Sequence, residues 1–141
     1  MAITFHTSDV DFVLREKNRL RNWIDAVVMR QGMHVGNLSF VFCSDHYLLG
    51  VNQRFLQHDT YTDIITFDYV EGNILSGDIM ISIDRVRDNA KKYRVPFVHE
   101  LHRVMIHGVW HLMGQGDKSE EERSAMRACE DRALSLWQEI G

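Results

Sequence analysis

Hydrophobic residues alternate with polar ones in some segments of the chain and recur every three or four residues in others. The β-branched and aromatic runs predict strands over residues 3–5, 38–43, 63–70 and 77–83. Helical spacing predicts helices over residues 8–29, 44–55, 84–93, 96–113 and 119–140. This order predicts an α+β fold in which a small mixed sheet of about four strands packs with about five helices. The first β-α-β unit should give a parallel strand pair, and the last two strands an antiparallel hairpin.

Local signals mark where several of these helices begin. Ser8, followed by acidic residues, and Ser44 are typical N-terminal caps. Pro96 suits the first turn of a helix, and Ser119 with Glu122 matches a capping box. The last two helices each carry an apolar stripe, formed by Leu101, Val104, Met105, Val109 and Leu112 and by Met126, Cys129, Ala133, Leu136, Trp137 and Ile140.

Length and composition are those of an ordinary globular protein. The chain has 141 residues, 45% hydrophobic and 26% charged, so we expect one domain over residues 1–141. It shows neither a run that could span a bilayer nor a signal peptide, which predicts a cytoplasmic protein without a membrane partner. Cys43 and Cys129 form no C-x-x-C pair and are expected to be buried free thiols. The net charge of −4 argues against binding nucleic acid by global charge, so an RNA partner would need a local basic groove.

The segment HGVWHLMGQGDK carries the most specific chemistry in the chain. His107 and His111 are four residues apart and therefore share one face of a helix. Gly114 can end that helix in a left-handed turn and bring Asp117 back toward the two imidazoles. Three nitrogen and oxygen ligands leave one tetrahedral position open, which is typical of a catalytic zinc site.

A plainer interpretation places the two histidines on a solvated helix face. That interpretation must also account for Gly114 and for an acid at the right distance beyond it, so we favour a site for one Zn²⁺ ion held by His107, His111 and Asp117. Iron, nickel and manganese accept the same donors. The spacing is similar to that of metzincin peptidases, but their general-base glutamate is replaced here by Gly108, which argues against peptide hydrolysis.

A second segment, VNQRFLQHDTYTDIITFDY, and the tripeptide Gly77-Asp78-Ile79 accompany the metal motif. Together they resemble the bacterial YbeY family of metal-dependent endoribonucleases, whose C-terminal motif is close to H-G-x-L-H-L-x-G-Y-D-H. The second segment is similar to the family pattern at Asn52, Arg54, Asp59, Thr62, Asp63 and Phe67, with Tyr61 in place of a proline. The metal motif departs from the family at Trp110, at Gln115 and at the third ligand, where Asp117 replaces the usual histidine.

The resemblance implies cleavage of single-stranded RNA in the maturation of the 3′ end of small-subunit ribosomal RNA, and a role in ribosome quality control. It also implies a partner in the small ribosomal subunit and gives Arg54 a catalytic role. A guanidinium at Arg54 can bind a phosphate and stabilise transition-state charge, although from the residues alone Arg54 reads as solvated. Thr62 and Asp63 read as turn and strand-start residues, and His46 and His58 as surface residues. The basic residues before Pro96 form either a solvated helix face or an RNA-facing patch.

Three hypotheses follow from these residues. The first is a zinc-dependent endoribonuclease in which His107, His111 and Asp117 hold the ion and Arg54 positions the phosphate. The second is a zinc hydrolase of another substrate, such as a peptide, against which Gly108 argues. The third is a ribosome-associated binding module whose metal is structural, which predicts four protein ligands.

Overall fold

A four-stranded mixed sheet forms the centre of the fold. The computed structural model describes residues 2–56 and 62–140. Strands β1 (Ala2–Thr7), β2 (His34–Cys43), β4 (Ile74–Ser82) and β3 (Ile64–Asp68) lie side by side in the order β1-β2-β4-β3. β2 is parallel to β1 and to β4, whereas β3 and β4 form an antiparallel hairpin. The predicted fold class, the parallel β-α-β unit and the hairpin are therefore confirmed.

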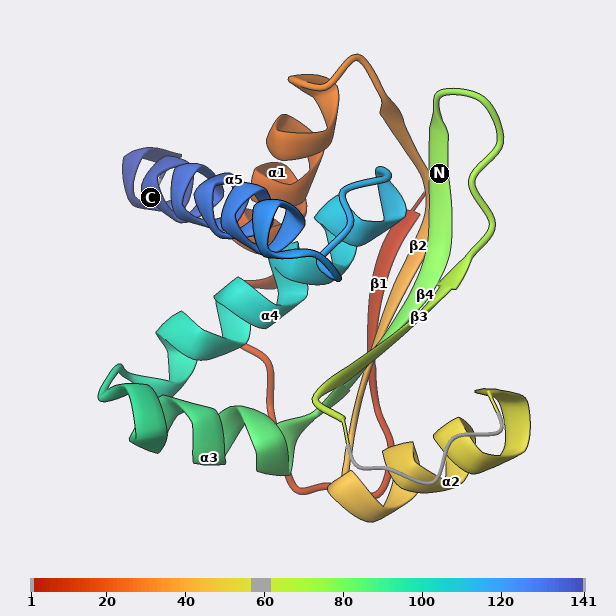
Figure 1. Cartoon of the computed structure of the whole chain (residues 1–141), viewed down its shortest axis with the longest axis vertical. Coiled ribbons are helices and arrows are strands. Elements are labelled where there is room, and N and C mark those ends of the chain that lie inside the picture. The colour runs from red at the N-terminus through yellow and green to blue at the C-terminus, as the bar shows by residue number, and fades with distance from the viewer. Residues whose placement is uncertain (1, 57–61, 141) are drawn as a thin grey trace.

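Five helices in the described part of the chain cover the sheet unequally. They are α1 (Lys17–Met29), α2 (Asp45–Leu56), α3 (Ile83–Tyr93), α4 (Phe97–Leu112) and α5 (Glu120–Ile140). Helices α1 and α4 lie along one face with α5 against them, and α2 lies apart on the other side of the sheet (Figure 1). Accordingly, the main core joins α1, α4 and α5 to the sheet, and a small second cluster of Cys43, Leu48, Val51 and Ile65 lies under α2. None of the described helices is long and apolar enough to cross a membrane.

Helix α4 approaches the sheet closely, and a glycine makes this possible. A Cβ atom on Gly108 would lie 2.9 Å from Ile64 Cδ1 and 2.9 Å from Ile79 Cγ2. Position 108 therefore faces β3 and β4 without room for a side chain. The predicted apolar stripe of this helix, from Leu101 to Leu112, is buried along its whole length. Tight packing of α4 on the sheet fixes the position of His107 and His111, which lie on the less buried side of this helix.

Two predicted caps are confirmed. The Ser44 hydroxyl accepts a hydrogen bond from the backbone N–H of Tyr47 at 3.0 Å, at the start of α2. At the start of α5, the Glu122 N–H donates to the Ser119 hydroxyl at 3.0 Å and the Ser119 N–H donates back to the Glu122 carboxylate at 3.1 Å. Cys43 and Cys129 are free and buried, as expected.

Three sequence predictions about the helices are wrong in detail. The first helix begins at Lys17 and not at Ser8. Asp9 does not cap this helix, because its carboxylate accepts a hydrogen bond from the backbone N–H of Ser44 at 2.9 Å and so ties the segment after β1 to α2. Pro96 is the N-cap of α4 and precedes the helix proper. Ile140, predicted to lie on the buried stripe of the last helix, is 38% exposed because α5 extends beyond the helices it packs against.

Candidate functional site

The end of α4 and the turn after it bring His107 and Asp117 into contact. Gly114 has φ +100°, a left-handed conformation that a residue with a Cβ rarely adopts, and its N–H donates to the carbonyl of His111 at 3.0 Å. The chain then reverses, and Asp117 Oδ2 lies 3.2 Å from His107 Nε2. His111, one turn beyond His107, lines the same pocket. The reversal that the sequence predicted is therefore present.

Glu130 holds the other nitrogen of His107. Its Oε2 lies 2.7 Å from His107 Nδ1, and its Oε1 accepts a hydrogen bond from Arg103 Nη1 at 2.8 Å. A second nitrogen of Arg103 donates to Asp131 at 2.8 Å. The side chains of Glu130 and Arg103 are only 7% and 12% exposed, so this network is held in a poorly solvated environment. The sequence reasoning missed Glu130, although an acid beside Met126, Cys129 and Ala133 on an apolar stripe was an available signal.

Burial and nearby charges raise the pKa values of His107 and Asp63. Burial alone would lower the pKa of His107, but the hydrogen bond and charge of Glu130, with the charges of Asp117 and Asp63, outweigh it and raise that pKa. Burial raises the pKa of Asp63, and the nearby positive charge of His107 only partly opposes this. A carboxyl group whose pKa lies above its usual range is better suited to exchange protons near neutral pH.

The donor atoms fit a divalent metal ion in their chemistry. With a proton on Nδ1 shared with Glu130, the neutral form of His107 would have Nε2 free to bind a metal ion on the side of Asp117. His107 Nε2 and Asp117 Oδ2 lie 3.2 Å apart, so an imidazole nitrogen and a carboxylate oxygen, both donors that zinc accepts, meet at this point of the pocket. Within residues 2–56 and 62–140, however, no three His, Cys, Asp or Glu side chains come close enough together to form a metal cluster.

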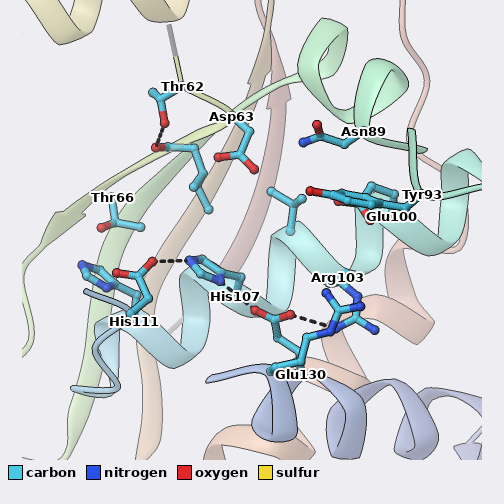
Figure 2. Close-up of a pocket in the computed structure, with 14 residues that line it drawn as sticks. Thr62, Asp63, Thr66, Asn89, Tyr93, Glu100, Arg103, His107, His111 and Glu130 are labelled. Carbon is cyan, nitrogen blue, oxygen red and sulfur yellow. Dashed lines mark hydrogen bonds and ion pairs between the residues drawn. The ribbon is translucent and has the colours of Figure 1, made fainter. Parts of the chain in front are cut away.

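These side chains face a pocket of about 440 Å³ between β3, α3, α4 and α5. Figure 2 shows His107 and Glu130 on one side of it and Asn89, Tyr93 and Glu100 on another. The pocket is lined by Thr62, Asp63, Ile64, Thr66, Asn89, Tyr93, Glu100, Arg103, Val104, His107, His111, Asp117, Arg127 and Glu130. Polar and charged groups therefore converge on the predicted histidine pair from four elements of the fold.

Comparison with known proteins settles the family. The family model described as "Endoribonuclease YbeY" matches residues 2–138. The chain belongs to the YbeY family. Proteins named "Endoribonuclease YbeY" from Parabacteroides distasonis and Phocaeicola vulgatus are 47% and 48% identical to it, over 99% and 95% of this chain and 98% and 97% of theirs. A solution structure of TM1509 from Thermotoga maritima has a similar fold, with a TM-score of 0.65 and 22% identity over 98% of this chain and 93% of that chain.

The remaining residues of the YbeY resemblance lie in different places. Thr62 and Asp63 line the pocket, and the Thr62 hydroxyl also donates to the carbonyl of Ile64 at 3.3 Å, as a residue at a strand start can. Arg54 is exposed in the last turn of α2 and is not among the residues that line the pocket. His46 is exposed, as predicted, whereas Asp59 and His58 lie outside the described residues.

Proposed function

We propose that this protein is a zinc-dependent endoribonuclease whose catalytic site is the pocket of His107, His111 and Asp117. One observation carries the proposal: a buried carboxylate, Glu130, orients His107 so that Nε2 faces Asp117. A histidine held this way is the usual arrangement of a metal ligand. Membership of the YbeY family supports RNA as the substrate.

The ion would be held by His107 Nε2, by the His111 imidazole and by Asp117. Such an ion supplies Lewis acidity, which stabilises negative charge on a phosphodiester group. Three ligands from this chain leave a position for substrate or water. Because Asp117 is an anion, the site carries less positive charge than a site with three histidines.

The protein groups around these ligands have separate roles. Arg103 donates to Glu130 and Asp131 and so holds Glu130 against His107. Arg127 lines the pocket, is exposed and is our candidate for contact with an RNA phosphate there. Asp63, with its raised pKa, is our candidate proton acceptor. Arg54, exposed on α2, would bind a phosphate of the RNA that extends beyond the pocket.

We further propose that the RNA is ribosomal. In this account the protein acts in the cytoplasm on single-stranded RNA near the 3′ end of the small-subunit RNA, in contact with the small ribosomal subunit. The net charge of −4 makes a local contact surface necessary. Helix α3 offers one, because it bears basic residues and also contributes Asn89 and Tyr93 to the pocket wall.

The structure weighs against peptide hydrolysis at this site. A peptidase of metzincin spacing needs a glutamate directly after the first histidine. That position is Gly108, where a Cβ would lie 2.9 Å from Ile79 Cγ2. The side chain of a glutamate at position 108 would clash with the sheet and would not extend into the pocket.

A cleavage assay separates these possibilities. Purified protein with added Zn²⁺ is incubated with single-stranded RNA, with the same sequence as a duplex, and with an unstructured peptide. We expect cleavage of the single strand and not of the peptide, and we expect His111→Ala to abolish it. Full RNA cleavage by His111→Ala, or peptide cleavage that a chelator stops, would refute the proposal.

A further inference from the structure

Glu100 is a buried acid that the mechanism does not use. It is 5% exposed, lies in the first turn of α4 and lines the pocket. Within the described part of the chain, its carboxylate oxygens accept no hydrogen bond and join no ion pair, and Arg103 acts on it only through longer-range charge. The Glu100 oxygens are not among the solvent-inaccessible polar atoms that lack a partner, so they open on the pocket and can accept hydrogen bonds from a ligand there. The helix N-terminus favours the negative charge but supplies no donor to the oxygens.

Two side chains of α3, Asn89 and Tyr93, line the same pocket as Glu100. Tyr93 is 56% exposed, and both Tyr93 and the Asn89 amide point into the pocket (Figure 2). An exposed aromatic ring is a platform on which an unpaired RNA base stacks, and such stacking accepts every base. A carboxylate and an amide beside such a ring can read the base edge by hydrogen bonds.

We propose that Tyr93, Asn89 and Glu100 form a base-binding subsite that selects guanine in single-stranded RNA. Guanine presents two adjacent N–H donors on its Watson–Crick edge, and a carboxylate accepts both at once. The Asn89 amide then supplies a donor for the guanine O6. Adenine and cytosine place an acceptor beside their amino group, which a carboxylate repels. The subsite rests on the proposed function, because it lies in the same pocket as His107 and Asp117.

Binding of guanine is consistent with the electrostatics of Glu100. Burial raises the pKa of this carboxyl group, and Arg103 only partly opposes the effect. Two N–H donors stabilise the ionised form, so they would replace the interactions with water that burial removes. No other described side chain provides such donors to Glu100 in the unliganded protein.

The test uses fluorescein-labelled uridine octamers that carry one G, A or C at a central position. Binding to the purified protein is measured by fluorescence anisotropy, and cleavage of the same octamers is followed with Zn²⁺ added. We expect the G octamer to bind at least ten-fold more tightly than the A and C octamers. Glu100→Gln should reduce this preference below about two-fold, because it weakens binding of the G octamer and removes the repulsion that weakens binding of the A octamer.

Tyr93 separates stacking from base reading. Tyr93→Ala should weaken binding of all octamers about ten-fold, and Tyr93→Phe by less than about two-fold, because the ring is retained. Tyr69→Ala is the matched control, since Tyr69 is 58% exposed and lines a different pocket. Thermal melting checks that Glu100→Gln is folded. If it is not, the wild-type preference and the Tyr93 pair still decide the matter.

The outcomes distinguish this subsite from the proposed activity. Equal binding of the G, A and C octamers, a G preference that survives in folded Glu100→Gln, or a Tyr93→Ala variant that behaves like Tyr69→Ala would each overturn the subsite. Cleavage without base preference would leave the endoribonuclease proposal intact and refute the subsite. A preference for G without any RNA cleavage would support the subsite and count against the activity.

Discussion

Replacing Glu130 by glutamine perturbs the contact on which the metal proposal depends. Both oxygens of Glu130 accept hydrogen bonds, one from Arg103 Nη1 at 2.8 Å and one facing His107 Nδ1 at 2.7 Å. Glutamine keeps the shape but has only one acceptor oxygen. If its amide nitrogen faces Arg103, two donors meet. If it faces His107, the imidazole must move its proton to Nε2 and loses the lone pair that faces Asp117.

The expected effect of Glu130→Gln follows from these contacts. Loss of a carboxylate that orients a metal-binding histidine lowers metal affinity about 10–100-fold. A buried group left with a mismatched partner costs about 1–3 kcal/mol of folding free energy, and Glu130 is buried. We therefore expect zinc affinity to fall at least ten-fold and the melting temperature to fall by several degrees. Competition with a chromophoric chelator measures the first quantity, and thermal denaturation the second.

Asp131→Asn is the matched control for this experiment. Asp131 binds the other end of Arg103 at 2.8 Å but is 59% exposed and does not contact His107. Its loss should cost less than about 1 kcal/mol and change zinc affinity less than about two-fold. In the metal-free protein, at a pH high enough to keep the imidazole neutral, the protonated nitrogen of His107 read by NMR should shift from Nδ1 toward Nε2 in Glu130→Gln only. Zinc affinity and tautomer equal to wild type in Glu130→Gln would refute the orienting role.

Three further predictions concern the fold. Gly108→Ala should lower the free energy of unfolding by up to about 2 kcal/mol in chemical denaturation, because crowding against β3 and β4 outweighs the gain in helix propensity. Gly50→Ala, whose Cβ would meet nothing closer than 3.9 Å, should raise the free energy of unfolding by about 0.5–1 kcal/mol in the same assay. Burial lowers the pKa of His102 to about 4 from 6.5, so the unfolded chain binds the extra proton as pH falls from about 6.5 to 4. Stability should therefore drop by about 3 kcal/mol over that range, and a His102→Gln variant whose stability falls as steeply would contradict this. Ser119→Ala should lower the free energy of unfolding by about 1 kcal/mol, because it removes the N-terminal cap of α5. Ser124→Ala, at an exposed position within that helix, should change it by less than about 0.5 kcal/mol, and equal losses in the two variants would rule out the cap.

Local patterns were sufficient to predict most of the fold. The alternation in β2 and the helical stripes of α4 and α5 each reflect one buried face, so the elements could be located from sequence. The start of α1 could not. Asp9 resembles a residue at the start of a helix, but its carboxylate accepts a hydrogen bond from the backbone N–H of Ser44, 35 positions away. Such a long-range contact cannot be inferred from a local pattern.

The site was predictable where spacing alone determines geometry. His107 and His111 share a helix face because of the helical period, and Gly114 permits the turn that returns Asp117. Glu130 reaches the pocket because α5 packs against α4, and its place on an apolar stripe does not specify which residue of α4 it meets. The helical period places Glu100 on the histidine face of α4, but the wall that α3 forms beside it depends on tertiary packing. A motif match did not predict the position of Arg54. This residue belongs to the YbeY resemblance, yet it lies in α2 and does not line the pocket.

Zinc-dependent RNA cleavage by wild type and Asp117→Ala tests the central claim most directly. Protein treated with a chelator is titrated with Zn²⁺, and the rate of cleavage of a single-stranded RNA is measured at each step. The account predicts no cleavage without metal, a rise to a plateau at one ion per chain in the wild type, and a loss of rate in Asp117→Ala that needs far more Zn²⁺ to recover. Cleavage by the metal-free wild type at the plateau rate, or a titration of Asp117→Ala that coincides with that of the wild type, would contradict it.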